Sequence, residues 1–239
     1  MKVFISLGHG GEVGAMANGT NEHAEVVAVA NKIKQYLPVI PFEVVFVPYE
    51  YNLEQRIKFV NQTGTKDDYL LELHMNASGS MRTRGSEVYY YAGYPNLQMI
   101  AAKIAENYSV FSKTMNAGPK KDTEVRFGRL GIIRDTKPIA FLIEMGYITN
   151  VDDLMLVREK SAYAVVQALM ALTGNKYLES TTIPKISVVT TPVDPHKIAV
   201  DWAITTKVSN GERPKETATR EEVLHMIFNY HKFLKNDQS

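Results

Sequence analysis

The 239-residue sequence contains no cysteine, which excludes disulfide bonds, thiolate metal ligands and a cysteine nucleophile. Any metal ion would have to be held by histidine and carboxylate side chains. No apolar run approaches the roughly 18 residues of a membrane span, so no membrane partner is expected. The sequence also has almost no excess of positive over negative charge, with 27 lysines and arginines and 26 aspartates and glutamates. This balance argues against nucleic acid as a partner.

The amino terminus lacks the features of a secretion signal. Its apolar stretch, residues 3–7, is much shorter than the apolar core of a signal peptide and leads directly into a glycine-rich segment. We therefore expect a soluble protein made in the cytoplasm without a signal peptide. If it acts outside the cell, another route must release it.

Short apolar runs alternate with longer segments that have helical i, i+3, i+4 spacing. The runs predict strands at residues 3–7, 42–47, 69–75, 88–91 and 139–143. The longer segments predict helices at residues 22–37, 52–60, 97–111 and 152–172. Alternating strands and helices predict an α/β fold with a mostly parallel sheet flanked by helices.

The composition changes after residue 178, where we place the end of the main domain, residues 1–178. Six of the 17 residues from 179 to 195 are serine or threonine and three are proline, which predicts an extended linker. Residues 196–239 then form a small, mainly helical module. Thr219 and Glu222 fit a capping box that opens a helix ending near Leu234.

Four polar side chains lie at or after the ends of predicted strands or open a helix. His9 lies between glycines after the first strand, Glu22 opens the first helix, His74 closes the third strand, and Glu144 ends a strongly apolar run. The carboxyl ends of parallel strands meet at one rim of a sheet, where ligands bind. We therefore expect these side chains to lie close together.

Two histidines and two glutamates at one rim predict a metal hydrolase. Two imidazoles and one carboxylate can bind Zn²⁺ and leave a position for water, while the second carboxylate transfers protons. The residues leave alternatives open, because Glu25 or His23 could replace Glu22, and His74 could instead pair with Glu72 or a backbone carbonyl. Burying an ionised glutamate in an apolar run costs free energy unless a cation or hydrogen bonds compensate it. Glu144 is therefore the strongest single candidate for a functional residue.

Several separate motifs occur in a characteristic order over roughly residues 1–177. They are Gly8-His9-Gly10-Gly11, Gly14-Ala15, Asn18-Gly19-x-x-Glu22, His74-Met75-Asn76-Ala77, Leu130-Gly131-x-x-Arg134 and Glu144-Met145-Gly146-Tyr147-x-x-Asn150. This order resembles the zinc-dependent N-acetylmuramoyl-L-alanine amidases of the Amidase_3 type. The resemblance implies an Amidase_3-like fold, with His9, Glu22 and His74 as zinc ligands and Glu144 as the catalytic carboxylate. Glu25 is then expected to be an exposed helix residue.

The resemblance implies hydrolysis of the amide between N-acetylmuramic acid and L-alanine, with peptidoglycan as the partner and a phage endolysin as the setting. Arg134 or Arg129 is expected to help hold the developing oxyanion, and Asn76 to bind substrate at the start of a mobile loop that ends at Gly85. The alternatives are a zinc peptidase cutting within the stem peptide and a non-catalytic wall-binding protein. A two-carboxylate glycosidase would leave both histidines unexplained.

The C-terminal module carries a second resemblance. Trp202-Ala203, Ser209-Asn210-Gly211, Pro214 and the segment 218–222 resemble part of an S-layer-homology-type motif and the tails of some phage endolysins. This implies cell-wall binding through a secondary wall polymer. The alternative is a helical cap that packs Trp202, Ile227 and Phe228 against the main domain. So short a module is at the limit of independent stability, which also makes it a candidate for homo-oligomer formation.

Overall fold

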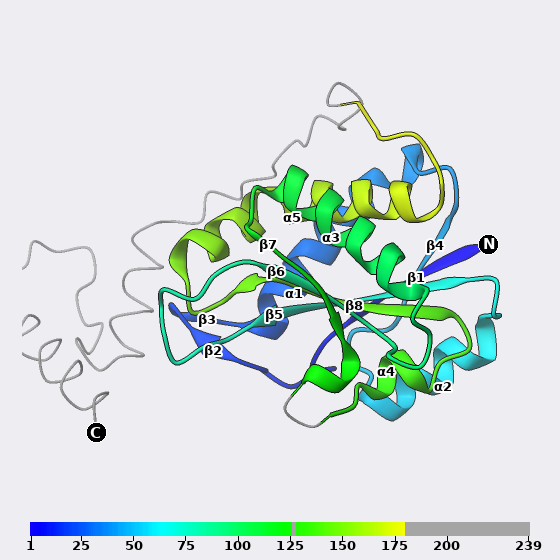
Figure 1. The fold of residues 1–239 in the computed structure, drawn as a ribbon, viewed down its shortest axis with the longest axis horizontal. Coiled ribbons are helices and arrows are strands. Elements are labelled where there is room, and N and C mark those ends of the chain that lie inside the picture. Colours follow the sequence, from blue (N-terminus) through cyan, green and yellow to red (C-terminus); the bar gives the residue numbers. More distant parts are fainter. Residues whose placement is uncertain (126–127, 180–239) are drawn as a thin grey trace, which may run out of the picture. The chain divides into compact units, whose positions relative to one another are not determined.

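The computed structural model describes residues 1–125 and 128–179, which belong to one unit of the chain, Met1–Lys185. Its centre is a six-stranded sheet of order β4-β1-β5-β8-β6-β7 (Figure 1). The strands are β1 (Lys2–Leu7), β4 (Glu43–Phe46), β5 (Tyr69–Asn76), β6 (Ser86–Tyr90), β7 (Asn116–Lys121) and β8 (Ile139–Tyr147). Neighbouring strands are parallel except for β6 and β8, which are antiparallel. The predicted mostly parallel sheet is confirmed.

Helices cover both faces of this sheet (Figure 1). One face carries α1 (Glu22–Ile33), α3 (Leu97–Ser112) and α5 (Val151–Leu172), and the other carries α2 (Leu53–Thr63) and the short α4 (Gly131–Arg134). A small hairpin of β2 (Met16–Ala17) and β3 (Thr20–Asn21) precedes α1. Short 3-10 helices occupy Lys34–Val39 and Asp122–Glu124.

Side chains alternate between the two faces along each strand and so divide the core into two layers. The larger layer lies under α1, α3 and α5 and includes Val3, Ile5, Leu71, Leu73, Phe141 and Ile143. The smaller layer lies under α2 and α4 and includes Phe4, Leu70, Ala140 and Leu142. On this second face, Glu72, His74 and Glu144 lie in the carboxyl-terminal halves of β5 and β8. The second face therefore changes from apolar to polar towards the rim.

β7 is a strand that the sequence did not predict. It contains Gly118 and Pro119, which are unfavourable inside a central strand. The structure places β7 at the edge of the sheet, paired with β6 alone, where a proline is tolerated. The first helix is also shorter than predicted, because the chain tightens into a 3-10 helix at Lys34, before Pro38.

The prediction that Glu25 is an exposed helix residue is wrong. Its exposed fraction is 5%. Its carboxylate accepts hydrogen bonds from Nε of Arg158 (2.9 Å), from Nη2 of Arg158 (2.5 Å) and from the Thr20 hydroxyl (2.6 Å). The arginine lies on α5, which packs against α1, and no local pattern in the sequence reveals a partner 133 residues away.

We expect residues 76–85 to form a mobile loop, and its mobility stays a prediction. In the structure, this segment is hydrogen-bonded to residues at the start of α5. The Ser78 amide donates to the Thr149 hydroxyl (3.2 Å), and the Asn150 side chain donates to the carbonyl of Met81 (2.8 Å). The Gly85 amide donates to the buried carboxylate of Asp153 (2.7 Å). These contacts hold the loop at both ends and in its middle.

The predicted linker lies, except for Glu179, outside the described residues, and the predicted C-terminal module lies wholly outside them. The boundaries of both parts stay predictions. Within residues 1–125 and 128–179, no helix combines the length and the apolar character needed to cross a membrane.

The segment that follows α5 is held to that helix through Gln167. Its buried side chain donates to the Leu178 carbonyl (2.7 Å) and accepts from the Leu178 amide (2.9 Å). The Tyr163 hydroxyl donates to the same carbonyl (2.8 Å). Residues up to Leu178 therefore form part of this folded unit.

Replacing Gln167 with methionine keeps the side-chain volume but removes both hydrogen bonds to Leu178. We expect the free energy of unfolding to fall by about 1–3 kcal/mol, because the partly buried Leu178 amide loses its partner and the Leu178 carbonyl keeps only Tyr163. Urea denaturation followed by circular dichroism measures the change. Gln62→Met, on the exposed surface of α2, is the matched control. Equal losses in both variants would contradict a stabilising role for this contact.

Candidate metal and catalytic centre

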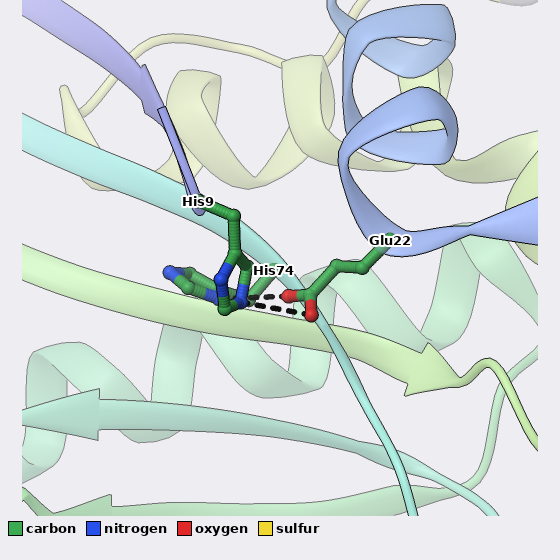
Figure 2. Close-up of side chains that lie close together, drawn as sticks. All are labelled: His9, Glu22 and His74. Carbon is green, nitrogen blue, oxygen red and sulfur yellow. Dashed lines mark hydrogen bonds and ion pairs between the residues drawn. The ribbon is translucent and has the colours of Figure 1, made fainter. Parts of the chain in front are cut away.

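Three side chains from different parts of the chain converge near the carboxyl ends of β1 and β5 (Figure 2). His9 follows β1, Glu22 is the first residue of α1, and His74 lies in β5. Nε2 of His9 lies 2.9 Å from one Glu22 oxygen, and Nδ1 of His74 lies 2.8 Å from the other. Ligand atoms of all three residues lie within 4.8 Å of one another. This cluster has the size and the donor atoms of a site for one metal ion.

The backbone around the cluster needs glycine at two positions. A Cβ atom added at Gly8 would lie 2.3 Å from Cε1 of His74, so the imidazole ring occupies the space that a side chain would need. A Cβ atom at Gly14, whose φ is +65°, would lie 2.7 Å from the His9 ring and 2.8 Å from a Glu22 oxygen. His9 itself has a φ of 63°, an uncommon conformation for a residue with a side chain. The cluster is therefore packed directly against backbone.

Glu22 is held by the start of α1. The Asn21 side chain caps this helix by accepting from the Ala24 amide (2.9 Å). The Glu22 carboxylate also accepts from the backbone amides of Ala15 (3.2 Å) and Met75 (3.0 Å). Burial alone would raise the pKa of Glu22, but its hydrogen bonds with the two histidines hold the pKa well below its usual range. Glu22 is thus ionised at neutral pH.

His74 lies between two carboxylates. Its Nδ1 faces Glu22, and its Nε2 lies 3.0 Å from Oε1 of Glu72. Burial alone would lower the pKa of the imidazole, but its hydrogen bonds with Glu22 and Glu72 raise it to about 10. The sequence had offered a metal and Glu72 as alternative partners for His74, and the structure places Glu72 and Glu22 on opposite nitrogens of the ring.

Glu144 lies beside His74 on the neighbouring strand. The two residues are register partners of the parallel β5–β8 pair, so their side chains point to the same face of the sheet. Oε2 of Glu144 is buried and has no hydrogen-bond partner among the described residues. Burial, together with the negative charges of Glu22, Glu87 and Glu72, raises the pKa of Glu144 to about 7, although nearby His74 acts in the opposite direction. Near neutral pH such a carboxyl group can both accept and donate a proton.

A cavity of about 550 Å³ opens beside the cluster. It is lined by His9, Gly10, Glu12, Asn52, Leu53, Glu54, Arg56, Glu72, His74, Arg129, Leu130, Gly131, Ile132, Leu142 and Glu144. The cavity therefore extends from the two histidines and Glu144 towards the first turn of α2 and the segment before α4. Its volume is within the range of ligand-binding clefts in proteins.

Of the two arginines expected to contact the substrate, only one lines the cavity. Arg129 lines the cavity, whereas Arg134 does not belong to the lining residues. The Arg134 guanidinium pairs with buried Asp122 and lies over the ring of Tyr91, 5.1 Å from its centre. The Asn76 side chain is 3.5 Å from Glu87 and accepts from the Ala77 amide. Substrate binding by Arg134 and Asn76 stays a prediction.

Arg56 is a cavity residue that the sequence did not point to. It lies on α2, is almost fully buried, and donates to Glu72 (2.8 Å) and to the Leu7 carbonyl (2.6 Å). The sequence contains one sign of such a residue. Glu72 and His74 occupy alternate positions of an apolar strand, and two polar side chains on one buried face need polar partners from another element.

The fold is shared with solved amidase structures. The N-acetylmuramoyl-L-alanine amidase from Clostridium difficile 630 matches with a TM-score of 0.63 and 20% identity, over 73% of this chain and 97% of that one. The catalytic domain of the CD27L endolysin, which targets Clostridium difficile, matches with a TM-score of 0.60 and 24% identity, over 75% of this chain and 99% of that one. These likenesses confirm the Amidase_3-like α/β fold.

The family model Amidase_3, N-acetylmuramoyl-L-alanine amidase, matches residues 3–172, and the chain belongs to this family. It is 26% identical over 174 residues to the N-acetylmuramoyl-L-alanine amidase LytC of Bacillus subtilis, covering 68% of this chain and 34% of that protein. It is 26% identical over 164 residues to the endolysin of Bacillus phage SPP1, covering 66% of this chain and 59% of that protein. The match thus spans about a third to three fifths of the length of these relatives.

The close approach of His74 to Gly8 yields a test of the cluster. We expect Gly8→Ala to weaken metal binding about tenfold or more, because the new methyl group must displace the His74 ring. Competition between the protein and a chromophoric chelator for Zn²⁺ measures the affinity. Gly79→Ala is the matched control, since a Cβ atom there meets nothing within 4 Å. An unchanged affinity in Gly8→Ala would show that His74 does not bind the metal.

Proposed function

We propose that this chain is a zinc-dependent amidase that hydrolyses the bond between N-acetylmuramic acid and the L-alanine of the stem peptide in peptidoglycan. The observation that carries the proposal is the convergence of His9, Glu22 and His74 at one rim of the sheet, with Glu144 on the next strand. Membership of the N-acetylmuramoyl-L-alanine amidase family supports the choice of substrate.

The donor atoms of the cluster suit zinc. Two imidazole nitrogens and one carboxylate form a typical protein ligand set for catalytic zinc, and the fourth position stays free for water. Nε2 of His9, the Glu22 carboxylate and Nδ1 of His74 would hold the ion, and both histidines line the cavity through which substrate and water enter. When bound, zinc polarises the scissile carbonyl and lowers the pKa of a water molecule.

Glu144 supplies the proton transfers in this proposal. Its carboxylate accepts a proton from the attacking water and then donates that proton to the amine of the departing L-alanine. In the metal-free protein the pKa of Glu144 is about 7, so this buried carboxyl group can both take up and release a proton near neutral pH. Arg129, which lines the cavity, is our candidate for contact with the substrate.

For the biological setting we propose action as an endolysin that opens the bacterial cell wall. The matched proteins include the endolysin of Bacillus phage SPP1 and the catalytic domain of the CD27L endolysin. Attachment to a secondary wall polymer through residues 196–239 belongs to the same proposal. Addition of the purified protein to bacterial cells should lower their turbidity, and unchanged turbidity across Gram-positive species would contradict a lytic role.

Digestion of purified peptidoglycan tests the reaction itself. We expect new amino-terminal L-alanine, which disappears with a chelator and returns with added Zn²⁺. Glu144→Gln should slow the release by about 10²–10⁴-fold, because the proton-transfer group is lost. Glu106→Gln, on the exposed surface of α3, is the control. Other new amino termini would indicate a peptidase, new reducing sugars a glycosidase, and an unchanged wall would refute the proposal.

The raised pKa of Glu144 also predicts how stability depends on pH in the metal-free protein. The pKa is about 7 in the folded state against 4.5 for an ordinary glutamate, so folding favours the protonated form. The resulting stabilisation is complete below about pH 4.5 and is lost as the pH rises through 7. Glu144→Gln cannot ionise and should be more stable than the wild type at about pH 8.5, by up to about 3 kcal/mol.

Urea denaturation in the presence of a chelator, at about pH 4.5 and 8.5, measures this difference. The advantage of Glu144→Gln should shrink towards zero at the lower pH. The same advantage at both pH values would mean that Glu144 does not titrate between them, which would contradict the raised pKa.

A further inference from the structure

The imidazole of His74 has a defined partner on the nitrogen that faces away from His9 and Glu22. Nδ1 points to Glu22, in the cluster of Figure 2, and Nε2 lies 3.0 Å from Oε1 of Glu72. Glu72 precedes His74 by two residues on β5, so both side chains lie on the same face of the strand. The geometry therefore gives each ring nitrogen a different carboxylate.

Glu72 is itself fixed by Arg56 of α2. Nη1 of Arg56 donates to Oε1 of Glu72 (2.8 Å) and to the carbonyl of Leu7 (2.6 Å), at the end of β1. The side chains of Arg56 and Glu72 are 7% and 3% exposed. A buried carboxylate is costly without a positively charged donor, and a buried guanidinium is costly without a negatively charged acceptor. The Glu72 oxygen is thus held in one place between α2, β1 and β5.

The position of this oxygen decides which His74 nitrogen is free to bind a metal ion. A neutral imidazole carries its proton on one nitrogen and an electron pair on the other. If Nε2 donates to Glu72, the electron pair lies on Nδ1, on the side of Glu22 and His9. Histidines that bind metals commonly donate their other N–H to a carboxylate, which fixes both tautomer and ring orientation.

We propose that Glu72, anchored by Arg56, is a positioning residue that fixes the orientation and tautomer of His74 for metal binding. The proposal rests on the proposed function only in taking the cluster as a metal site. Its test is metal affinity, which is measured without the amidase reaction.

The competing explanation is that Glu72 serves only as the counter-ion of buried Arg56. The Glu25–Arg158 pair offers a matched comparison, because Glu25 is also buried and also bonds an arginine, while its hydrogen bonds go to Arg158 and Thr20 instead of His74. A purely structural ion pair would affect stability alone. A positioning residue would affect metal affinity as well.

The experiment titrates Zn²⁺ into the full chain in competition with a chromophoric chelator and compares Glu72→Leu with Glu25→Gln. Removing one member of a buried pair leaves an unpaired charge and can unfold the protein. The double variant Arg56→Met, Glu72→Leu is therefore measured too, since it removes both charges and keeps an apolar volume. We expect both Glu72 variants to bind zinc about 10–100-fold more weakly than the wild type. Glu25→Gln should change the affinity by less than about threefold.

Nitrogen-15 NMR of the zinc-loaded protein gives a second readout. The wild type should show a slowly exchanging proton on Nε2 of His74, and the double variant should lose this protection. Wild-type zinc affinity and an intact Nε2 proton in the double variant would overturn the proposal. If the wild type binds zinc but releases no L-alanine termini from peptidoglycan, the amidase function fails while the positioning role stands. A wild type that binds no zinc would overturn the positioning role.

Discussion

The buried carboxylate of Glu22 is the interaction on which the rest of the site depends. It accepts hydrogen bonds from two imidazoles and from the backbone amides of Ala15 and Met75. These donors belong to the segment after β1, the turn before β2 and strand β5, so one side chain joins three parts of the chain. A buried carboxylate without such partners would be costly. The same contacts keep Glu22 ionised and bring His9 and His74 to one point.

Three glutamates near this point have different environments and so different protonation states. Glu22 and Glu72 each face strong donors, which favour the ionised form. The Glu144 carboxyl group receives no hydrogen bond from the described residues, and it faces Glu87 across the β6–β8 pair. Its pKa therefore rises to about 7. Burial and pairing, rather than residue type, therefore set the protonation states of the three glutamates that we propose as metal ligand, positioning group and proton carrier.

Local patterns in the sequence were enough for most of the fold, because strand and helix periodicity is a property of neighbouring residues. They failed at β7, where Gly118 and Pro119 conceal an edge strand. The rim positions of His9, His74 and Glu144 followed from strand ends, but the choice of Glu22 over Glu25 came from family resemblance. Ion pairs such as Arg56–Glu72 and Arg158–Glu25 could not be predicted, since each joins two elements that are brought together only by folding.

The two faces of the same strands perform different tasks. On the face under α1, α3 and α5, apolar side chains continue to the carboxyl ends of β1, β5 and β8, namely Val3, Ile5, Leu7, Leu71, Leu73, Met75, Phe141, Ile143 and Met145. On the opposite face, Leu70 is followed by Glu72 and His74, and Leu142 by Glu144. A slip of one residue in register would exchange the faces and place three ionisable groups in the larger core. The cost of that exchange fixes the register of β5 and β8, and with it the position of the candidate site.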